Sequence, residues 1–144
     1  MLYLHKLGKS FGKKRALDGV TLRVARGETL AIMGPSGCGK STLLRCVQRI
    51  VEPDEGEIWF DGVSVRELEG SALRAYRRRI GFVFQTPNLV PHMSALENVA
   101  LGPRMAGLSG VQARRRAEEA LARVGLSGLA SASPEQMSGG ERQR

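Results

Sequence analysis

The chain has 144 residues, a net charge of +8, 42% hydrophobic residues and 25% charged residues, which is typical of a folded globular protein rather than a disordered chain or a fibre. Its two cysteines exclude a disulfide-stapled secreted scaffold, and its length suits one domain with a hydrophobic core. No apolar run approaches the ~20 residues that cross a bilayer, and the N-terminus does not resemble a signal peptide. We therefore expect a soluble, cytoplasmic protein.

The first third of the sequence predicts two strands, followed by a strand, a loop and a helix in succession. Apolar and polar residues alternate over residues 2–4 and 20–24, as in half-buried strands. The apolar run at 29–33 ends at a glycine, which predicts a buried strand of a parallel sheet. A glycine-rich loop covers 34–39, and apolar residues at helical spacing predict a helix over 40–50.

The remaining chain alternates turns, strands and helices before a region interrupted by prolines. The predicted elements are a turn at 53–56, a strand at 57–61, a helix at 71–79, a buried strand at 80–84, a short helix at about 94–101 among Pro87, Pro91 and Pro103, and a longer helix from Ser109 to Val124. Small and polar residues at 127–133 predict a linker.

The strongest motif is the loop between the predicted strand and helix, which matches the phosphate-binding pattern G-x-x-x-x-G-K-S/T in full. Glycines let the backbone wrap round phosphates, and the helix directs its positive N-terminal end at the same anion. We expect Lys40 to contact the β- and γ-phosphates of ATP, and the Ser41 hydroxyl to be a ligand of Mg²⁺. The expected nucleotide-binding residues here are Gly34, Pro35, Ser36, Gly37, Cys38, Gly39, Lys40, Ser41 and Thr42.

The cysteines and histidines do not point to a metal site. Cys46 follows Cys38 by eight residues, a rise of about 12 Å along a helix, which is too far for a disulfide or a shared metal ion. We expect Cys46 to be a packing residue and Cys38 to react with thiol reagents. His5 and His92 have no partners at metal-ligand spacing and are expected on the surface.

Two arginine runs, at 77–79 and 114–116, leave two interpretations open. Such runs can contact nucleic-acid phosphates or anionic lipid headgroups. They can also line solvated helix faces, and Glu118 and Glu119 follow the second run at ion-pairing spacing. Because aromatic residues make up only 5% of the chain and none is interleaved with the runs, the solvated faces are favoured.

Three further features accompany the loop. Phe11 precedes Gly12 upstream of it, Gln85 closes an apolar run, and the sequence Met-Ser-Gly-Gly-Glu occupies residues 137–141. In this order and spacing, the motifs resemble the nucleotide-binding domain of ATP-binding cassette (ABC) transporters over the whole chain. The resemblance implies an α/β P-loop NTPase fold of the ABC ATPase type, with an N-terminal antiparallel β part, an incomplete parallel sheet with helices, and an α-helical subdomain.

The resemblance also implies roles for residues that would otherwise be read as ordinary. Phe11 would stack on adenine, although a lone phenylalanine is more often a core residue. Gln85 would contact Mg²⁺ and the attacking water, so Lys40 and Gln85 are the expected catalytic residues. The signature motif would cap the γ-phosphate bound to the opposite subunit through Ser138, Gly139, Gly140 and Glu141. The family usually has Leu-Ser-Gly-Gly-Gln there, and Met and Glu replace its Leu and Gln.

A narrower resemblance to importers of polar amino acids lies in residues 43–46, 84–85, 91–99 and 101–103. It implies an ATPase subunit that couples ATP binding and hydrolysis to import of a small polar solute. The implied partners are a second ABC ATPase subunit in a homodimer, transmembrane permease subunits docked on residues after Gln85, and a solute-binding protein, with no nucleic acid. The subunit would be cytoplasmic and peripheral on the inner face of the cell membrane. A non-transport ABC protein acting on ribosomes or nucleic acid, and a product that only binds nucleotide, remain alternatives.

The family's remaining catalytic elements are not among the 144 residues. We expect one partial ATPase domain, truncated before Walker B, with a nucleotide-binding core at 1–85 and a Q-loop and helical subdomain at 86–144. The Walker B acidic pair and the switch histidine are missing, and His92 precedes the signature motif. Nucleotide binding is compatible with the residues present, whereas hydrolysis by this chain alone stays open.

Overall fold

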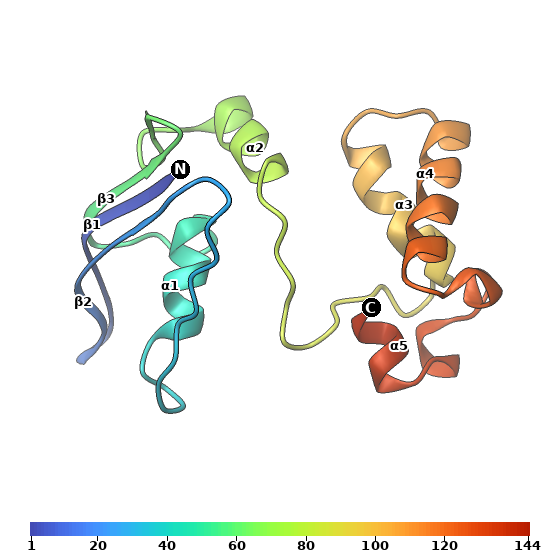
Figure 1. Ribbon diagram of the computed structural model, residues 1–144, viewed down its shortest axis with the longest axis horizontal. Helices are drawn as coiled ribbons and strands as arrows, with labels where there is room; N and C mark the ends of the chain where they lie inside the picture. The colour runs from blue at the N-terminus through green and yellow to red at the C-terminus, as the bar shows by residue number, and fades with distance from the viewer. The chain divides into compact units, whose positions relative to one another are not determined.

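The computed structural model describes all 144 residues, which divide into two compact units, Met1–Gly81 and Phe82–Arg144 (Figure 1). We call them the N-terminal and the C-terminal unit. The N-terminal unit contains β1 (Leu2–Phe11), β2 (Lys14–Val24), α1 (Lys40–Val47), β3 (Glu55–Phe60), β4 (Val63–Ser64) and α2 (Gly70–Arg78). The C-terminal unit contains α3 (Ala95–Met105), α4 (Gly110–Arg123), α5 (Gly139–Gln143) and the 3₁₀ turns η1 (Ser127–Leu129) and η2 (Pro134–Gln136).

A four-stranded antiparallel sheet of order β2-β1-β3-β4 forms one layer of the N-terminal unit. The predicted alternation of apolar residues sets its register, in which Leu4 pairs with Leu22 on one side and with Ile58 on the other. The register shifts near Lys6, whose φ is 47°. Gly56 lies against this bulge with φ 83°, and a Cβ there would come within 2.3 Å of the Lys6 carbonyl oxygen. Glycine is therefore required for β3 to approach β1.

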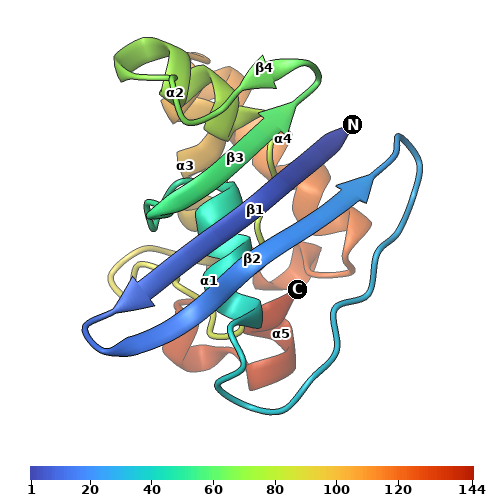
Figure 2. The ribbon, with the colours of Figure 1, turned by 90° about the vertical axis from the view of Figure 1, so that its left-hand side faces the viewer.

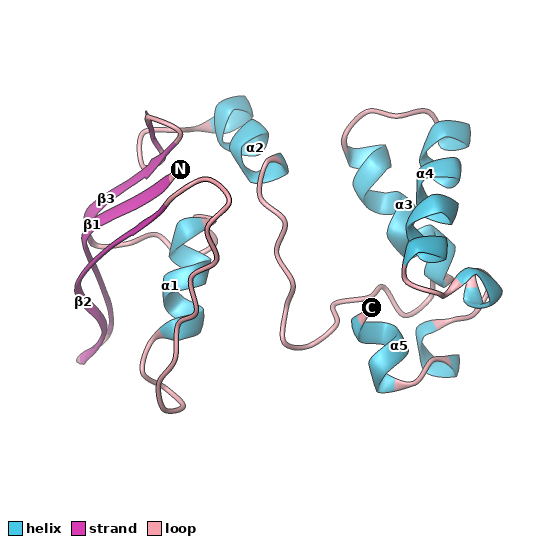
Figure 3. Cartoon of the chain, viewed as in Figure 1, coloured by secondary structure: helices cyan, strands magenta, loops and turns pink.

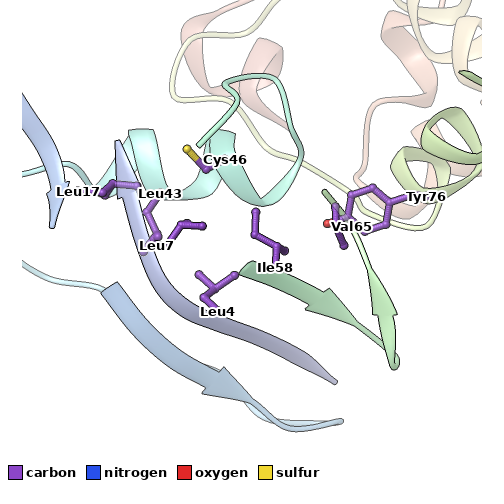
Figure 4. Packing of buried hydrophobic residues seen from close by; sticks show 8 residues of the cluster. All are labelled: Leu4, Leu7, Leu17, Leu43, Cys46, Ile58, Val65 and Tyr76. Atoms are coloured by element: carbon purple, nitrogen blue, oxygen red, sulfur yellow. The ribbon is translucent and has the colours of Figure 1, made fainter. Parts of the chain in front are cut away.

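Helix α1 covers one face of this sheet and closes the hydrophobic core of the unit (Figure 2). Leu4, Leu7 and Ile58 project from the sheet towards Leu43 and Cys46 of the helix (Figure 4). Four of these five side chains are at most 1% exposed, and Leu43 is 5% exposed. The prediction that Cys46 is a packing residue is confirmed.

Side chains from α2 hold the C-terminal end of α1. Tyr76 donates a 2.5 Å hydrogen bond to the Val47 carbonyl, and Arg77 donates to the carbonyls of Gln48 and Arg49. These carbonyls have no partner within the helix, so the contacts complete its last turn. Arg77 is exposed, as the solvated-face interpretation expects, and its guanidinium also has this structural role.

The arginine run of α4 does follow the solvated-face interpretation. Arg114 pairs with Glu118 at 2.9 Å and Arg115 with Glu119 at 3.1 Å, one helical turn apart, and both guanidinium-bearing side chains are more than two-thirds exposed. Such exposed pairs contribute only a few tenths of a kcal/mol each, about 0.3–0.5.

Neither segment expected as a buried parallel strand is a strand. Residues 29–33 and 80–84 are loop (Figure 3), with Met33 90% and Val83 81% exposed. A short apolar run becomes a strand only when a neighbour completes its hydrogen-bond ladder, and all pairings of the sheet are antiparallel ones among β1 to β4. Those two predictions of parallel strands are wrong for this structure.

Helices α3 and α4 pack against each other in the C-terminal unit through small residues, among them Ala100, Ala113 and Ala117. Each begins at a serine whose hydroxyl accepts from the backbone three residues on, while the side chain of that residue accepts from the serine N–H. Ser109 is the N-cap of α4, which confirms the predicted start of this helix. Helix α3 runs past the expected end at about residue 101, and Pro103 lies inside its last turn rather than ending it.

The predicted linker at 127–133 is instead an ordered part of this unit. The carbonyls of Ala132 and Ala130 accept hydrogen bonds of 2.9 Å from the N–H groups of Ala95 and Leu96, the first residues of α3. The same segment contributes Leu129 to an apolar cluster around Leu121 and Met137. The small residues, from which a linker was predicted, instead permit this close approach of the two backbones. No helix in the structure is both long enough and apolar enough to span a bilayer.

Candidate nucleotide-binding site

The glycine-rich loop runs along the start of β2 before it enters α1. Gly39, the last loop residue, has φ 99°, and a Cβ there would lie 2.2 Å from the Ala16 carbonyl oxygen and 3.2 Å from the Leu17 side chain. Only glycine fits both this backbone conformation and this space. The loop residues 34–38 themselves are exposed, as a site for a soluble ligand requires.

Helix α1 presents an uncompensated positive end to this loop. Its N-cap is Gly39, which has no capping side chain, and its first turn contains no acidic residue. The first helical N–H to bond within the helix is that of Leu43, to the Gly39 carbonyl at 2.8 Å. The N–H groups of Lys40, Ser41 and Thr42 therefore remain available, and together with the helix dipole they favour an anion.

Lys40 adds a full positive charge inside the loop. Its Nζ donates to the carbonyls of Gly34 and Pro35, both at 2.7 Å, and lies 3.6 Å from the Sγ of Cys38. No carboxylate pairs with this ammonium group. These contacts hold the ammonium group inside the loop, where a bound phosphate would replace the carbonyls as its acceptor.

Phe11 lies at the end of β1 in the same unit, and the residue is 51% exposed. Lys9 Nζ is 5.5 Å from the ring centroid, and Asp54 holds that lysine through a 2.7 Å ion pair. The Lys9 ammonium and the Ser10 N–H lower the pKa of Asp54, so this carboxylate stays ionised. Phe11 is therefore a surface residue whose ring contacts Lys9, and not the core residue that a lone phenylalanine usually is.

Lys14 is a neighbour of the loop that the sequence pattern did not single out. It pairs with Phe11 across the turn between β1 and β2, and its Nζ lies 3.9 Å from where a Cβ of Gly37 would stand. The motif describes residues along the chain, whereas this contact joins two segments by folding. The only sequence signal was its position beside the turn that follows Phe11.

Gln85 and the signature motif lie in the C-terminal unit. Gln85 is exposed in a bend and makes no side-chain hydrogen bond, while the carbonyl of its neighbour Phe84 accepts from the Gln143 side chain of α5 at 3.0 Å. The structure thus brings the segment of Gln85 beside the helix that follows Ser138.

The signature residues form the N-terminus of α5. The Ser138 hydroxyl accepts from the Glu141 N–H at 3.3 Å, and the Glu141 carboxylate accepts from the Ser138 N–H at 2.7 Å. The hydrogen bonds from Ser138 lower the pKa of Glu141. Gly139 and Gly140 are exposed between these two residues. A glutamine at position 141 would accept the same bond, so the departure from the family motif keeps this geometry and adds a negative charge.

An antiparallel β layer, a glycine-rich loop leading into a helix, and a following helical unit define an ATP-binding cassette. Residues 17–144 match the family model described as "ABC transporter". The chain belongs to the ABC transporter family, and the expected α/β fold of the ABC ATPase type is confirmed.

Solved structures and curated relatives agree with this assignment. The chain aligns with the dimeric structure of MJ0796, a bacterial ABC transporter cassette, at a TM-score of 0.89 and 39% identity, covering 99% of this chain and 65% of that one. It is 48% identical over 136 residues to the methionine import ATP-binding protein MetN of Brucella abortus (strain 2308), covering 94% of this chain and 37% of MetN. It is 44% identical over 145 residues to the lipoprotein-releasing system ATP-binding protein LolD of Bacteroides thetaiotaomicron, covering 100% of this chain and 66% of LolD. The chain therefore spans about a third to two thirds of the relatives it matches.

Proposed function

We propose that this chain is the nucleotide-binding part of an ABC transporter ATP-binding subunit and that it binds ATP with Mg²⁺ at residues 34–42. The observation that carries the proposal is the start of α1, where free N–H groups and the Lys40 ammonium converge with no acidic residue to neutralise them. Membership of the ABC transporter family supports ATP as the ligand and hydrolysis as the reaction.

Each expected site residue has a role in this proposal. Lys40 exchanges its loop carbonyls for the β- and γ-phosphates, and Ser41 supplies a hydroxyl ligand to Mg²⁺. The exposed ring of Phe11 stacks on adenine. With Mg²⁺ and ATP bound, Gln85 would hold a water at its side-chain amide, and the motif that begins at Ser138 would cap the γ-phosphate of a second subunit.

The same family supports an assembly around the subunit. Residues 1–85 and 86–144 would be two parts of one ATPase domain, which pairs with a second copy at the inner face of a membrane. A permease subunit would dock on residues after Gln85, where the C-terminal unit has a largely apolar hollow of about 310 Å³ that Leu89, Val99 and Leu121 help to line. A solute-binding protein would deliver the solute.

The transported solute in this proposal is a small polar molecule, an amino acid, moved inward. The similarity to a methionine import protein supports this direction. The lipoprotein-releasing relative supports the competing direction, because its identity to the chain is nearly as high. Reconstituted with its permease, the full subunit should hydrolyse ATP faster when an amino-acid-loaded binding protein is added, and stimulation by a lipoprotein instead would favour release.

The nucleotide site itself can be tested on the chain directly by titration with a fluorescent ATP analogue and Mg²⁺. Lys40→Ala should weaken binding at least about tenfold, because a hydrogen bond to a charged group contributes about 1.5–3 kcal/mol. Lys13→Ala, in the exposed turn after Phe11, is the matched control for loss of one positive charge. Equal affinity of Lys40→Ala and the control would contradict the proposed site.

A further inference from the structure

We propose that Lys14 is a second cation of the nucleotide site, supplied by the β1–β2 hairpin, and that it binds the α-phosphate of the nucleotide. This inference rests on the proposed function, because it assumes that the loop at 34–42 holds a nucleotide. It adds a residue that the phosphate-loop pattern does not contain.

The Lys14 ammonium lies beside the phosphate loop. Its Nζ lies 3.9 Å from the point that a Cβ of Gly37 would occupy, at the exposed part of the loop. Two residues further on, the Ala16 carbonyl touches the space beside Gly39. The start of β2 therefore runs along the loop, and Lys14 is placed by that contact rather than by a flexible tail.

No carboxylate neutralises the charge of Lys14. Its neighbour Arg15 takes the nearby carboxylates, at 2.9 Å from Asp18 and 3.1 Å from Glu55, whereas Lys14 belongs to none of the ion pairs. An ammonium group has only donors, and the backbone N–H groups of the loop and helix start are donors as well. A cation beside a loop of N–H donors favours an anion at that loop.

The places of Phe11 and Lys40 indicate which phosphate Lys14 binds. Lys14 is the cross-strand partner of Phe11 at the end of the hairpin, so it lies on the side of the loop where the base would stack. Lys40 lies at the first turn of α1 with its Nζ at the carbonyls of Gly34 and Pro35, and it is expected to meet the β- and γ-phosphates. The phosphate between the base and those two groups is the α-phosphate.

The test measures dissociation constants of the full chain for ADP and for ATP, at low and at high salt, for the wild type and three variants. Lys14→Gln should weaken both nucleotides by about the same factor, about tenfold at low salt, since both contain the α-phosphate. The loss should shrink at high salt, because the contact is between charges in water. Lys14→Arg should restore most of the affinity, and Lys13→Gln, with the same charge change one residue away, should stay within about twofold of wild type.

The possible outcomes separate this inference from the proposed function. If the wild type binds and Lys14→Gln matches Lys13→Gln, Lys14 is not a ligand residue, although the nucleotide site stands. If Lys14→Gln weakens ATP but leaves ADP unchanged, the assignment to the α-phosphate is wrong. If the wild type binds neither nucleotide, both proposals fail. An unfolding midpoint of Lys14→Gln equal to that of wild type, followed by fluorescence of the single tryptophan, Trp59, shows that folding is not the cause.

Discussion

Replacing Gly39 by alanine tests the physical reason for a glycine at the junction of the loop and α1. The substitution adds one methyl group at a residue with φ 99° and directs it at the main chain of β2. The Ala16 carbonyl oxygen would be 2.2 Å away, and a carbonyl held in a strand cannot rotate aside as a side chain can. Either the hairpin or the helix start must move.

The expected loss of unfolding free energy in Gly39→Ala has two parts. A left-handed backbone conformation costs a residue with a Cβ about 1–2 kcal/mol relative to glycine. Overpacking against a fixed neighbour costs a further ~1–3 kcal/mol. We therefore expect Gly39→Ala to lower the free energy of unfolding of the N-terminal unit by about 2–5 kcal/mol.

Gly12→Ala is the matched control, because Gly12 also has a positive φ, 57°, but nothing lies within 4 Å of its missing Cβ. Urea unfolding followed by Trp59 fluorescence reports on β3 in the same unit. The control should lose only the conformational part, about 1–2 kcal/mol. Equal losses for the two variants would refute the steric argument at Gly39. Nucleotide affinity should fall in Gly39→Ala even under conditions in which it is folded, because the helix start would be displaced.

Three further predictions concern stability and pH. Ile58→Ala should lower the free energy of unfolding by about 2–5 kcal/mol in the same urea assay, because this wholly buried side chain leaves a cavity beneath α1. Tyr76→Phe should cost about 0.5–1.5 kcal/mol by removing the bond to the Val47 carbonyl. Burial raises the pKa of Tyr76 to about 12 from its ordinary value of 10.0, so its contribution to stability is complete below pH 10 and should be lost between pH 10 and about 12. This loss should be absent from Tyr76→Phe. The N-terminal amine and then Arg79 lower the pKa of Asp61, so its contribution is present above the ordinary carboxyl pKa and lost as pH falls through the lower folded value. Acid unfolding of Asp61→Asn should therefore begin from a lower stability and depend less steeply on pH.

Local patterns in the sequence predicted the elements that local forces determine. The hairpin strands follow from alternation, and α4 follows from Ser109, whose hydroxyl and partner side chain fix the helix start within four residues. The phosphate loop was predicted for the same reason, since its motif is continuous along the chain. These features can be predicted without knowing which residues pack against them.

The failures are features that depend on distant neighbours. The runs at 29–33 and 80–84 have the composition of strands but no ladder partner in the sheet. The structural role of Arg77 was missed because the carbonyls to which it donates, those of Gln48 and Arg49, follow the end of α1 and lie 29 and 28 residues earlier in the sequence. Lys14 was missed for the same reason, because its neighbour Gly37 lies on another segment.

The hydrogen bonds from the first residues of α3 to the main-chain carbonyls of residues 130–132 restrict which sequence changes this part of the chain can accept over evolution. The N–H groups of Ala95 and Leu96 are met by main-chain carbonyls, which every amino acid possesses, so changes of side-chain identity preserve these bonds while the residue stays small. A single inserted or deleted residue would instead shift both carbonyls out of phase with α3. In relatives, length variation should therefore concentrate in the exposed connection between α3 and α4, around Gly107, and avoid the segment that ends at Ala132.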